Sequence, residues 1–168
     1  MNSDTRLRAA LGAVSDPELG GVTIGELGMV VAVRVDGDSV HIELSPTFLG
    51  CPALDFIRAD VTRAARREKP NATVDVRFVN VPVWTPDRIS ESGRRQLATL
   101  GIAVPDRTGS AACPYCGGLE LRAAGSVGPT ACRSVAWCGA CRNVVELMRR
   151  ADEPVAVSIT GRRTYAHI

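Results

Sequence analysis

The stretches that decide the fold of the C-terminal part are Cys113-Pro114-Tyr115-Cys116 and Cys138-Gly139-Ala140-Cys141, two Cys-x-x-Cys pairs separated by 21 residues. Two residues between cysteines allow one tight turn to place both sulfur atoms about 3.7 Å apart on a tetrahedral ion, given Zn–S bonds of about 2.3 Å. Gly117 and Gly139 supply the backbone freedom that such turns need. This spacing predicts a zinc ribbon over residues 113–150.

Four cysteine ligands leave no open coordination position, so a structural zinc ion is the expected occupant. The same ligands can also hold an iron–sulfur cluster, and the spacing leaves that alternative open. So short a module has little core of its own, and we expect its folding to depend on metal. Metal removal should then unfold the ribbon and leave the preceding domain intact. The predicted ligands are Cys113, Cys116, Cys138 and Cys141.

The distribution of cysteines divides the chain into two unlike parts. Of six cysteines in 168 residues, five lie within residues 113–141, and Cys51 stands alone. The net charge of +2 is too balanced to indicate nucleic acid or a membrane surface by itself. The longest apolar run, Met29–Val33, has five residues, far fewer than the roughly 20 of a transmembrane helix. Since the first residues also lack the apolar region of a signal peptide, we expect a cytoplasmic, reducing location, where paired cysteines bind metal.

Ahead of the cysteine-rich part, hydrophobic periodicity predicts a small α+β domain over residues 1–105. The order αββαβα predicts helices packed on one face of a mixed sheet of three or four strands. Ser90 is the candidate N-cap of the last helix, which should end at Gly101. The expected helices cover residues 5–14, 52–68 and 91–100, and the expected strands cover residues 29–35, 39–44 and 73–79.

The remaining segments complete the predicted organisation. Residues 106–112 are polar and short, which is typical of a linker, and the zinc ribbon follows at 113–150. Residues 151–168 form a C-terminal tail with one alternating stretch that could be a strand. The chain is therefore expected to be an α+β domain followed by a four-cysteine zinc ribbon.

Cys51 precedes Pro52, a residue that suits the first position of a helix, so we expect Cys51 at or beside an N-cap. There the helix dipole and free N–H groups favour a thiolate. Thr47 on the same loop, with Asp16 and Glu18 on an earlier turn, could close the same surface. From spacing alone, a buried and inert Cys51 is an equally open interpretation.

Two other features limit the thiol chemistry. His41 lies on the polar face of a predicted strand and His167 lies at the terminus, so no convincing general base accompanies Cys51, which argues against a cysteine hydrolase. Cys132, between the two cysteine pairs, is either a small buried filler or an extra thiol beside Arg133 that exchanges metal or reacts.

Several motifs together resemble a known combination of domains. Asp16-Pro17-Glu18, Glu26-Leu27-Gly28-Met29-Val30 and Thr47-x-x-Gly50-Cys51-Pro52 resemble the SufT-like (DUF59-type) iron–sulfur-assembly domain. Val83-Trp84-Thr85-Pro86-Asp87-Arg88-Ile89-Ser90-Glu91-x-Gly93-Arg94-Arg95-x-Leu97, Gly101-Ile102-Ala103-x-Pro105, and the ribbon with Thr130-Ala131-Cys132-Arg133 are similar to PaaD. PaaD-like proteins are accessory subunits of the bacterial phenylacetyl-CoA epoxidase system, and the resemblance covers roughly residues 5–150.

The resemblance implies a non-catalytic role in maturing a multicomponent oxygenase that contains a di-iron subunit and a flavin and [2Fe–2S] reductase. It implies that Cys51 is the reactive loop cysteine, that Asp16, Glu18 and Thr47 line its site, and that the site handles a transient iron–sulfur cluster. The implied partners are the oxygenase and reductase subunits and the iron–sulfur assembly machinery. A homodimer is left open.

Two alternatives remain at this point. The protein could be a structural oxygenase subunit that delivers no metal, with Trp84, Trp137 and Tyr115 as interface anchors. A nucleic-acid-binding zinc ribbon is less favoured, because residues 111–168 carry seven arginines and four acidic residues, a net charge of 7 − 4 = +3, with few aromatic side chains to stack on bases.

Overall fold

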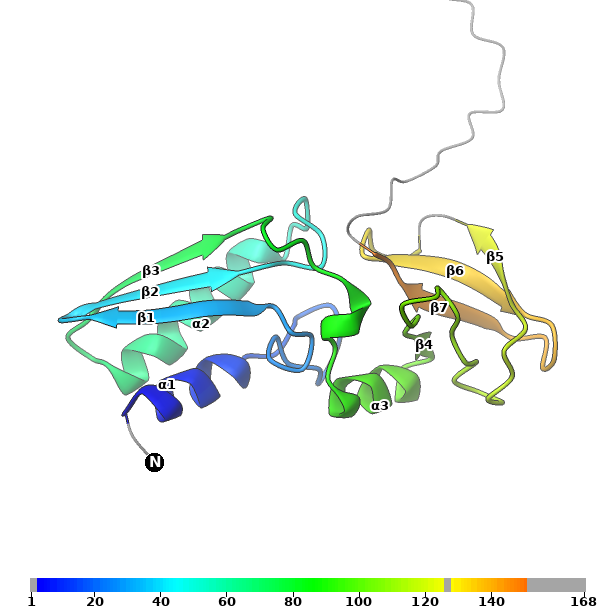
Figure 1. The fold of residues 1–168 in the computed structure, drawn as a ribbon, viewed down its shortest axis with the longest axis horizontal. Helices are drawn as coiled ribbons and strands as arrows, with labels where there is room; N and C mark the ends of the chain where they lie inside the picture. The colour runs from blue at the N-terminus through cyan, green and yellow to red at the C-terminus, as the bar shows by residue number, and fades with distance from the viewer. Residues whose placement is uncertain (1–2, 126–127, 151–168) are drawn as a thin grey trace, which may run out of the picture.

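A computed structural model describes residues 3–125 and 128–150, which form two sheets side by side (Figure 1). The first part contains α1 (Ser3–Gly12), β1 (Val30–Asp36), β2 (Ser39–Leu44), α2 (Leu54–Glu68), β3 (Thr73–Phe78), the short 3-10 helix η1 (Pro86–Arg88) and α3 (Glu91–Thr99). The second part contains β4 (Ile102–Ala103), β5 (Leu121–Gly125), β6 (Arg133–Cys138) and β7 (Val144–Met148). None of the helices in these residues is long and apolar enough to cross a membrane.

The first sheet has the order β1-β2-β3, with β2 antiparallel to β1 and parallel to β3. The turn between β1 and β2 passes through Gly37, whose φ of 54° suits glycine. Val40, Ile42 and Leu44 alternate with more exposed residues along β2 and are buried. Helices α1 and α2 lie together on one face of this sheet (Figure 1). The structure confirms the predicted α+β fold and its αββαβα order.

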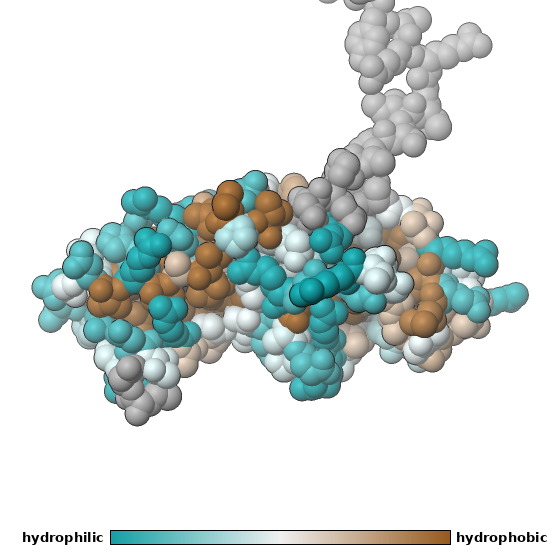
Figure 2. Space-filling model, in the orientation of Figure 1, coloured by the Kyte–Doolittle hydropathy of each residue, from teal (hydrophilic) through white to brown (hydrophobic). Residues whose placement is uncertain are grey.

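The core of the first part lies between the sheet and these two helices; Figure 2 shows the surface that covers it, where hydrophilic and hydrophobic residues are mixed. Ile57, Val61 and Ala64 of α2 are buried in this core, at the helical spacing seen in the sequence. Trp84 is 1% exposed, and its Nε1 donates a hydrogen bond of 2.8 Å to the carbonyl oxygen of Leu27. Trp84 is therefore a core residue that ties the segment after β3 to the loop before β1.

Helix α3 begins and ends as its sequence predicts. The Ser90 side chain accepts a hydrogen bond of 3.1 Å from the backbone N–H of Gly93, so Ser90 is the N-cap. After the helix, Gly101 has a φ of 77°, the left-handed conformation of a C′ glycine. This turn leads directly into β4, which contacts α3.

The second sheet has the order β4-β7-β6-β5 and joins the ribbon to the first part. β4 runs parallel to β7, so residues 102–103 belong to this sheet by their hydrogen bonds. Conversely, Ile102 and Met148 are 2% and 1% exposed and pack into the core of the first part. The two parts therefore share side chains across their boundary.

The segment over residues 106–112 is an ordered turn. Asp106 Oδ1 accepts hydrogen bonds from the backbone N–H groups of Thr108 and Ser110, at 2.8 and 3.0 Å. Ala111 then packs in the small apolar core of the ribbon. The predicted tail at residues 151–168, with its candidate strand, lies outside the described residues.

Candidate metal centre and cysteine pocket

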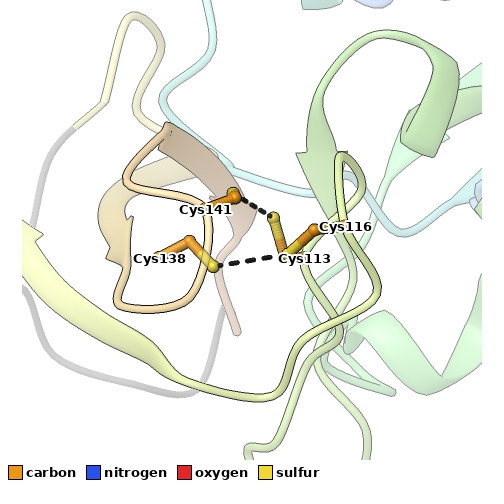
Figure 3. Close-up of side chains that lie close together, drawn as sticks. All are labelled: Cys113, Cys116, Cys138 and Cys141. Atoms are coloured by element: carbon orange, nitrogen blue, oxygen red, sulfur yellow. Dashed lines mark hydrogen bonds between the residues drawn. The ribbon is translucent and has the colours of Figure 1, made fainter.

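The four cysteines of the two Cys-x-x-Cys pairs converge on one point in the ribbon (Figure 3). Their sulfur atoms all lie within 4.8 Å of one another, and Cys113–Cys141 and Cys116–Cys138 are each 3.7 Å apart. That separation equals the edge of a tetrahedron of sulfur atoms around a metal with bonds of about 2.3 Å. The structure thus gathers the four predicted ligands into a metal site.

The backbone of each turn supports its sulfur atoms. Gly117 follows the first pair with a φ of 73°, and Arg142 follows the second pair with a φ of 63°. Gly139 was expected to provide the freedom of the second turn, but Arg142 is the left-handed residue. At Gly139 a Cβ would lie 2.7 Å from a carboxylate oxygen of Glu120, at the end of a flexible side chain that can move away.

Hydrogen bonds from N–H groups to two of the sulfur atoms oppose their protonation, although the neighbouring thiols raise the pKa of Cys116 to about 12. The backbone N–H of Gly118 donates to the Cys116 sulfur at 3.4 Å, and the Asn143 side chain donates to the Cys141 sulfur at 3.5 Å. A second hydrogen bond, from the backbone N–H of Asn143, is the main cause of the lowered pKa of Cys141. The ribbon's own apolar core is small, with Ala103, Ala111, Cys113, Cys138 and Val145 as its buried members.

Cys51 lines a cavity of about 250 Å³ between the two parts of the chain. Its thiol donates a hydrogen bond of 3.5 Å to Oε2 of Glu18, on the loop after α1. The helix that follows begins at Leu54 with Ala53 as its N-cap, so Cys51 lies two residues ahead of the cap and Pro52 is outside the helix. The full lining is Glu18, Phe48, Gly50, Cys51, Pro52, Pro129, Thr130, Ala131 and Cys132.

The electrostatics of Cys51 differ from the sequence expectation of a thiolate. Burial raises the pKa of the Cys51 thiol from 9.0 to about 11. The backbone N–H of Ala53 opposes this rise, whereas the negative charge of Glu18 adds to it. The expected effect of the helix start is therefore outweighed, and Cys51 is a neutral thiol at pH 7.

Asp16 and Thr47 lie on the two loops that carry Glu18 and Cys51. Asp16 is 8% exposed, and its Oδ1 accepts hydrogen bonds from the backbone N–H groups of Glu18 and Leu19, at 2.8 and 3.1 Å. Burial raises the pKa of Asp16, against the effect of these two hydrogen bonds. Thr47 is also 8% exposed and lies on the loop that leads to Cys51. Asp16 thus fixes the turn that carries Glu18, while neither Asp16 nor Thr47 lines the cavity.

Cys132 lines the same cavity, an arrangement that the sequence did not indicate. It is 6% exposed, and its sulfur lies 3.1 Å from Oγ1 of Thr130. Burial raises the pKa of this thiol, while the hydrogen bond with Thr130 and the charge of Arg133 oppose the rise. Cys51 and Cys132 are 81 residues apart, so only the packing of the ribbon against the first part brings their walls together.

The two histidines do not join this pocket in the described residues. His41 Nδ1 lies 3.5 Å from a carboxylate oxygen of Asp75 on β3, on a partly exposed surface of the sheet. His167 lies outside the described residues.

Comparison with known proteins identifies both parts of the chain. Residues 4–76 match the family described as iron–sulfur cluster assembly protein, and residues 102–149 match the PaaD zinc beta ribbon domain. A crystal structure of a domain of unknown function, DUF59, from Bacillus anthracis has a TM-score of 0.52 and 34% sequence identity. That comparison covers 56% of this chain and 91% of the other.

Two curated relatives extend the comparison. A proposed 1,2-phenylacetyl-CoA epoxidase subunit from Escherichia coli (strain K12) is 31% identical over 141 residues, which cover 80% of this chain and 85% of that protein. The Fe-S protein maturation auxiliary factor YitW of Bacillus subtilis (strain 168) is 38% identical over 97 residues, which cover 57% of this chain and 91% of that protein. With both domains present in this order, the chain belongs to the PaaD family, in which an iron–sulfur-assembly domain precedes a zinc ribbon.

Proposed function

We propose that this protein is a non-catalytic accessory factor that helps to assemble the iron–sulfur or di-iron centre of a multicomponent oxygenase of the phenylacetyl-CoA epoxidase type. The observation that carries the proposal is the placement of Cys51, on an iron–sulfur-assembly domain, in a cavity that also receives a wall from the ribbon. The names of the two curated relatives support the same role, one through the epoxidase and one through iron–sulfur maturation.

The ribbon has a structural role in this proposal. Zinc suits the four sulfur atoms, because their spacing fits a closed tetrahedral site and leaves no position for a substrate. The ion would hold the small ribbon together, so that its turn at residues 129–132 faces Cys51. The cargo of the protein is then handled at Cys51, away from the four-cysteine site, and the expected partners are the oxygenase and reductase subunits and the iron–sulfur assembly machinery. The cytoplasm remains the predicted compartment.

The test is the metal content of a client oxygenase produced with different forms of this protein. The oxygenase of phenylacetyl-CoA epoxidase type from the same organism is produced with the wild type, with Cys51→Ser, or without this protein. We expect Cys51→Ser to give oxygenase as poor in iron and as inactive as the preparation without the protein. The zinc content of the purified Cys51→Ser protein is the control for an intact fold, and unchanged client iron would contradict the proposal.

A second candidate is a structural oxygenase subunit that delivers no metal. The exposure of two aromatic side chains favours it, since Tyr115 is 57% and Trp137 is 40% exposed. Trp84, the third suggested anchor, is buried and does not contribute. Stable co-purification with the oxygenase at a fixed ratio, lost in Trp137→Ala and retained in Cys51→Ser, would support this candidate.

A further inference from the structure

The cavity beside Cys51 contains a second thiol that neither the zinc site nor the proposed function uses. Glu18, Phe48 and Cys51 form one wall, and the turn at residues 129–132 forms the other. Both cysteines are free thiols, and each lines the same space of about 250 Å³. Two soft sulfur ligands and one carboxylate therefore surround a single cavity.

We propose that Cys51 and Cys132 together ligate an iron–sulfur cluster of the [2Fe–2S] type in this cavity. The inference rests on the proposed function and deepens it, because it names the cargo and assigns a ligand from the ribbon. Thiolates are the usual protein ligands of such clusters.

The geometry favours a cluster over a single ion. Among the described residues, the four ribbon cysteines are the one group of three or more potential ligands placed so that it could hold a single metal ion. Cys51, Cys132 and Glu18 therefore do not enclose one metal atom. Two thiols that line one cavity of about 250 Å³, from segments far apart in the sequence, suit a ligand that presents a separate metal atom to each thiol. Glu18 lies at the Cys51 wall, where its carboxylate already accepts the thiol hydrogen bond.

The wall that carries Cys132 is held in place before any ligand binds. Arg133 Nε donates to Thr130 Oγ1 at 2.8 Å, and Arg133 Nη1 forms an ion pair of 2.7 Å with Glu146 on β7. The backbone N–H of Arg149 donates to the carbonyl oxygen of Cys132 at 2.9 Å. These contacts tie the turn to β6 and β7, so a cluster would meet a preorganised sulfur ligand.

Loading requires only an exchange of ligands. On a cluster carried by four glutathione thiolates, each of the two protein thiols forms one Fe–S bond as one Fe–S bond to glutathione breaks. The proton of each protein thiol leaves with the released glutathione, and the irons keep their oxidation states. Two positions on the cluster keep exchangeable ligands, as onward transfer to a client needs.

The experiment offers the glutathione-ligated [2Fe–2S] cluster to the full-length, zinc-loaded protein under anaerobic conditions. Bound iron and sulfide are measured after desalting, together with visible circular dichroism, which reports a cluster held by the protein. We expect the wild type to take up the cluster, and Cys51→Ser and Cys132→Ser each to lose affinity by at least about tenfold, by analogy with ligand-shell changes at metal sites. Ser134→Ala, on β6 and outside the cavity lining, is the matched control and should bind as the wild type does.

Because Cys132 is buried, a substitution there could unfold the ribbon. The zinc content of every variant, and a second variant, Cys132→Ala, distinguish a lost cluster ligand from a lost fold. Unchanged cluster binding by Cys132→Ser and Cys132→Ala, with loss in Cys51→Ser, would overturn the two-thiol site and leave the maturation role standing. Equal loading by Fe²⁺ alone would overturn the assignment to a cluster. The client-iron experiment fails or succeeds separately, since it measures the oxygenase and not this protein.

Discussion

At the scale of single residues, the carboxylate of Glu18 adds to the effect of burial in keeping Cys51 protonated. The two side chains are 33 positions apart in the sequence but share a hydrogen bond of 3.5 Å. Burial is the main reason that the pKa of Cys51 is raised to about 11, and the charge of Glu18 adds to it. A neutral thiol is protected from unwanted alkylation and oxidation until a ligand enters the cavity.

The substitution Glu18→Gln should therefore make Cys51 more reactive at a given pH. We expect the rate of Cys51 alkylation by iodoacetamide in the wild type to rise up to a pH near 11, and the midpoint in Glu18→Gln to move toward 9.0. Because the pKa in the folded state lies above its ordinary value, ionisation of Cys51 also weakens the fold as the pH rises from 9.0 toward 11. Mass spectrometry of the Cys51 peptide measures the rate at each pH.

The matched control is Glu91→Gln, which removes an exposed carboxylate from α3, away from the cavity lining. Its Cys51 midpoint should equal that of the wild type. A wild-type midpoint at or below 9.0 would contradict the raised pKa.

The sequence identified the four ribbon cysteines as a converging group, whereas of the residues predicted around Cys51 only Glu18 lines its cavity and Asp16 and Thr47 do not. The spacing of the ribbon cysteines was sufficient to identify four converging ligands. The expected thiolate at Cys51 was wrong, because desolvation and the charge of Glu18 depend on packing that no local pattern reveals. The placement of Cys132 in the Cys51 cavity was missed for the same reason, since it results from contact between the two parts.

At the scale of elements, the loop before β1 depends on a close approach between two backbone segments. Gly28 has a φ of 66°, and a Cβ at this position would lie 2.7 Å from the Cβ of Arg88 in η1 and close to its carbonyl group. Gly37, in the β1–β2 turn, also has a positive φ of 54°, but a Cβ added there would meet no atom within 4 Å beyond its chain neighbours. Substitution of each glycine by alanine therefore separates the cost of a left-handed backbone from the cost of a steric contact.

We expect Gly28→Ala to destabilise the protein more than Gly37→Ala does. The left-handed conformation should cost about 1–2 kcal/mol in both variants. Contact with the backbone of Arg88 should add about 1–3 kcal/mol in Gly28→Ala alone. The free energy of unfolding, measured by denaturant titration, gives the difference, and equal losses in the two variants would contradict the close approach.

The elements of the first part were largely predictable because each follows from a local pattern. Alternation fixed the buried face of β2, helical spacing fixed that of α2, and Ser90 marked the start of α3. Strand β4 was not predicted, because two residues are too few to show a period, and its partner β7 lies more than 40 residues away. The left-handed Arg142 was likewise invisible, since glycine is the usual residue in that conformation.

At the scale of the whole molecule, the two parts are joined by a shared core. Ile102 of β4 and Met148 of β7 belong to the ribbon's sheet but are buried in the core of the first part. Each such side chain contributes about 1.5–3 kcal/mol by burial. The stability of the first part therefore depends on the ribbon being folded.

Removal of the ribbon metal should accordingly weaken both parts to different degrees. We expect a strong zinc chelator to unfold the ribbon, and the free energy of opening of β1–β3 to fall by about 3–6 kcal/mol, because the side chains of Ile102 and Met148 are no longer buried in the first core. Amide hydrogen exchange of β1–β3 with and without chelator measures this loss. Met148→Ala in the metal-loaded protein should reproduce part of this loss, about 2–5 kcal/mol, and unchanged exchange after chelation would show that the parts are independent.

The cavity wall that carries Cys132 belongs to the ribbon, and this imposes an order of events on a newly made chain. On the expectation that the ribbon folds only with its metal, the turn at residues 129–132 is not in place until the four ribbon cysteines have bound an ion. If the ribbon binds zinc and the cavity binds a cluster, as we propose, zinc must be bound before the cluster. In a cell short of zinc, newly made chains would then fail to bind a cluster, instead of binding one and transferring it to an incorrect acceptor.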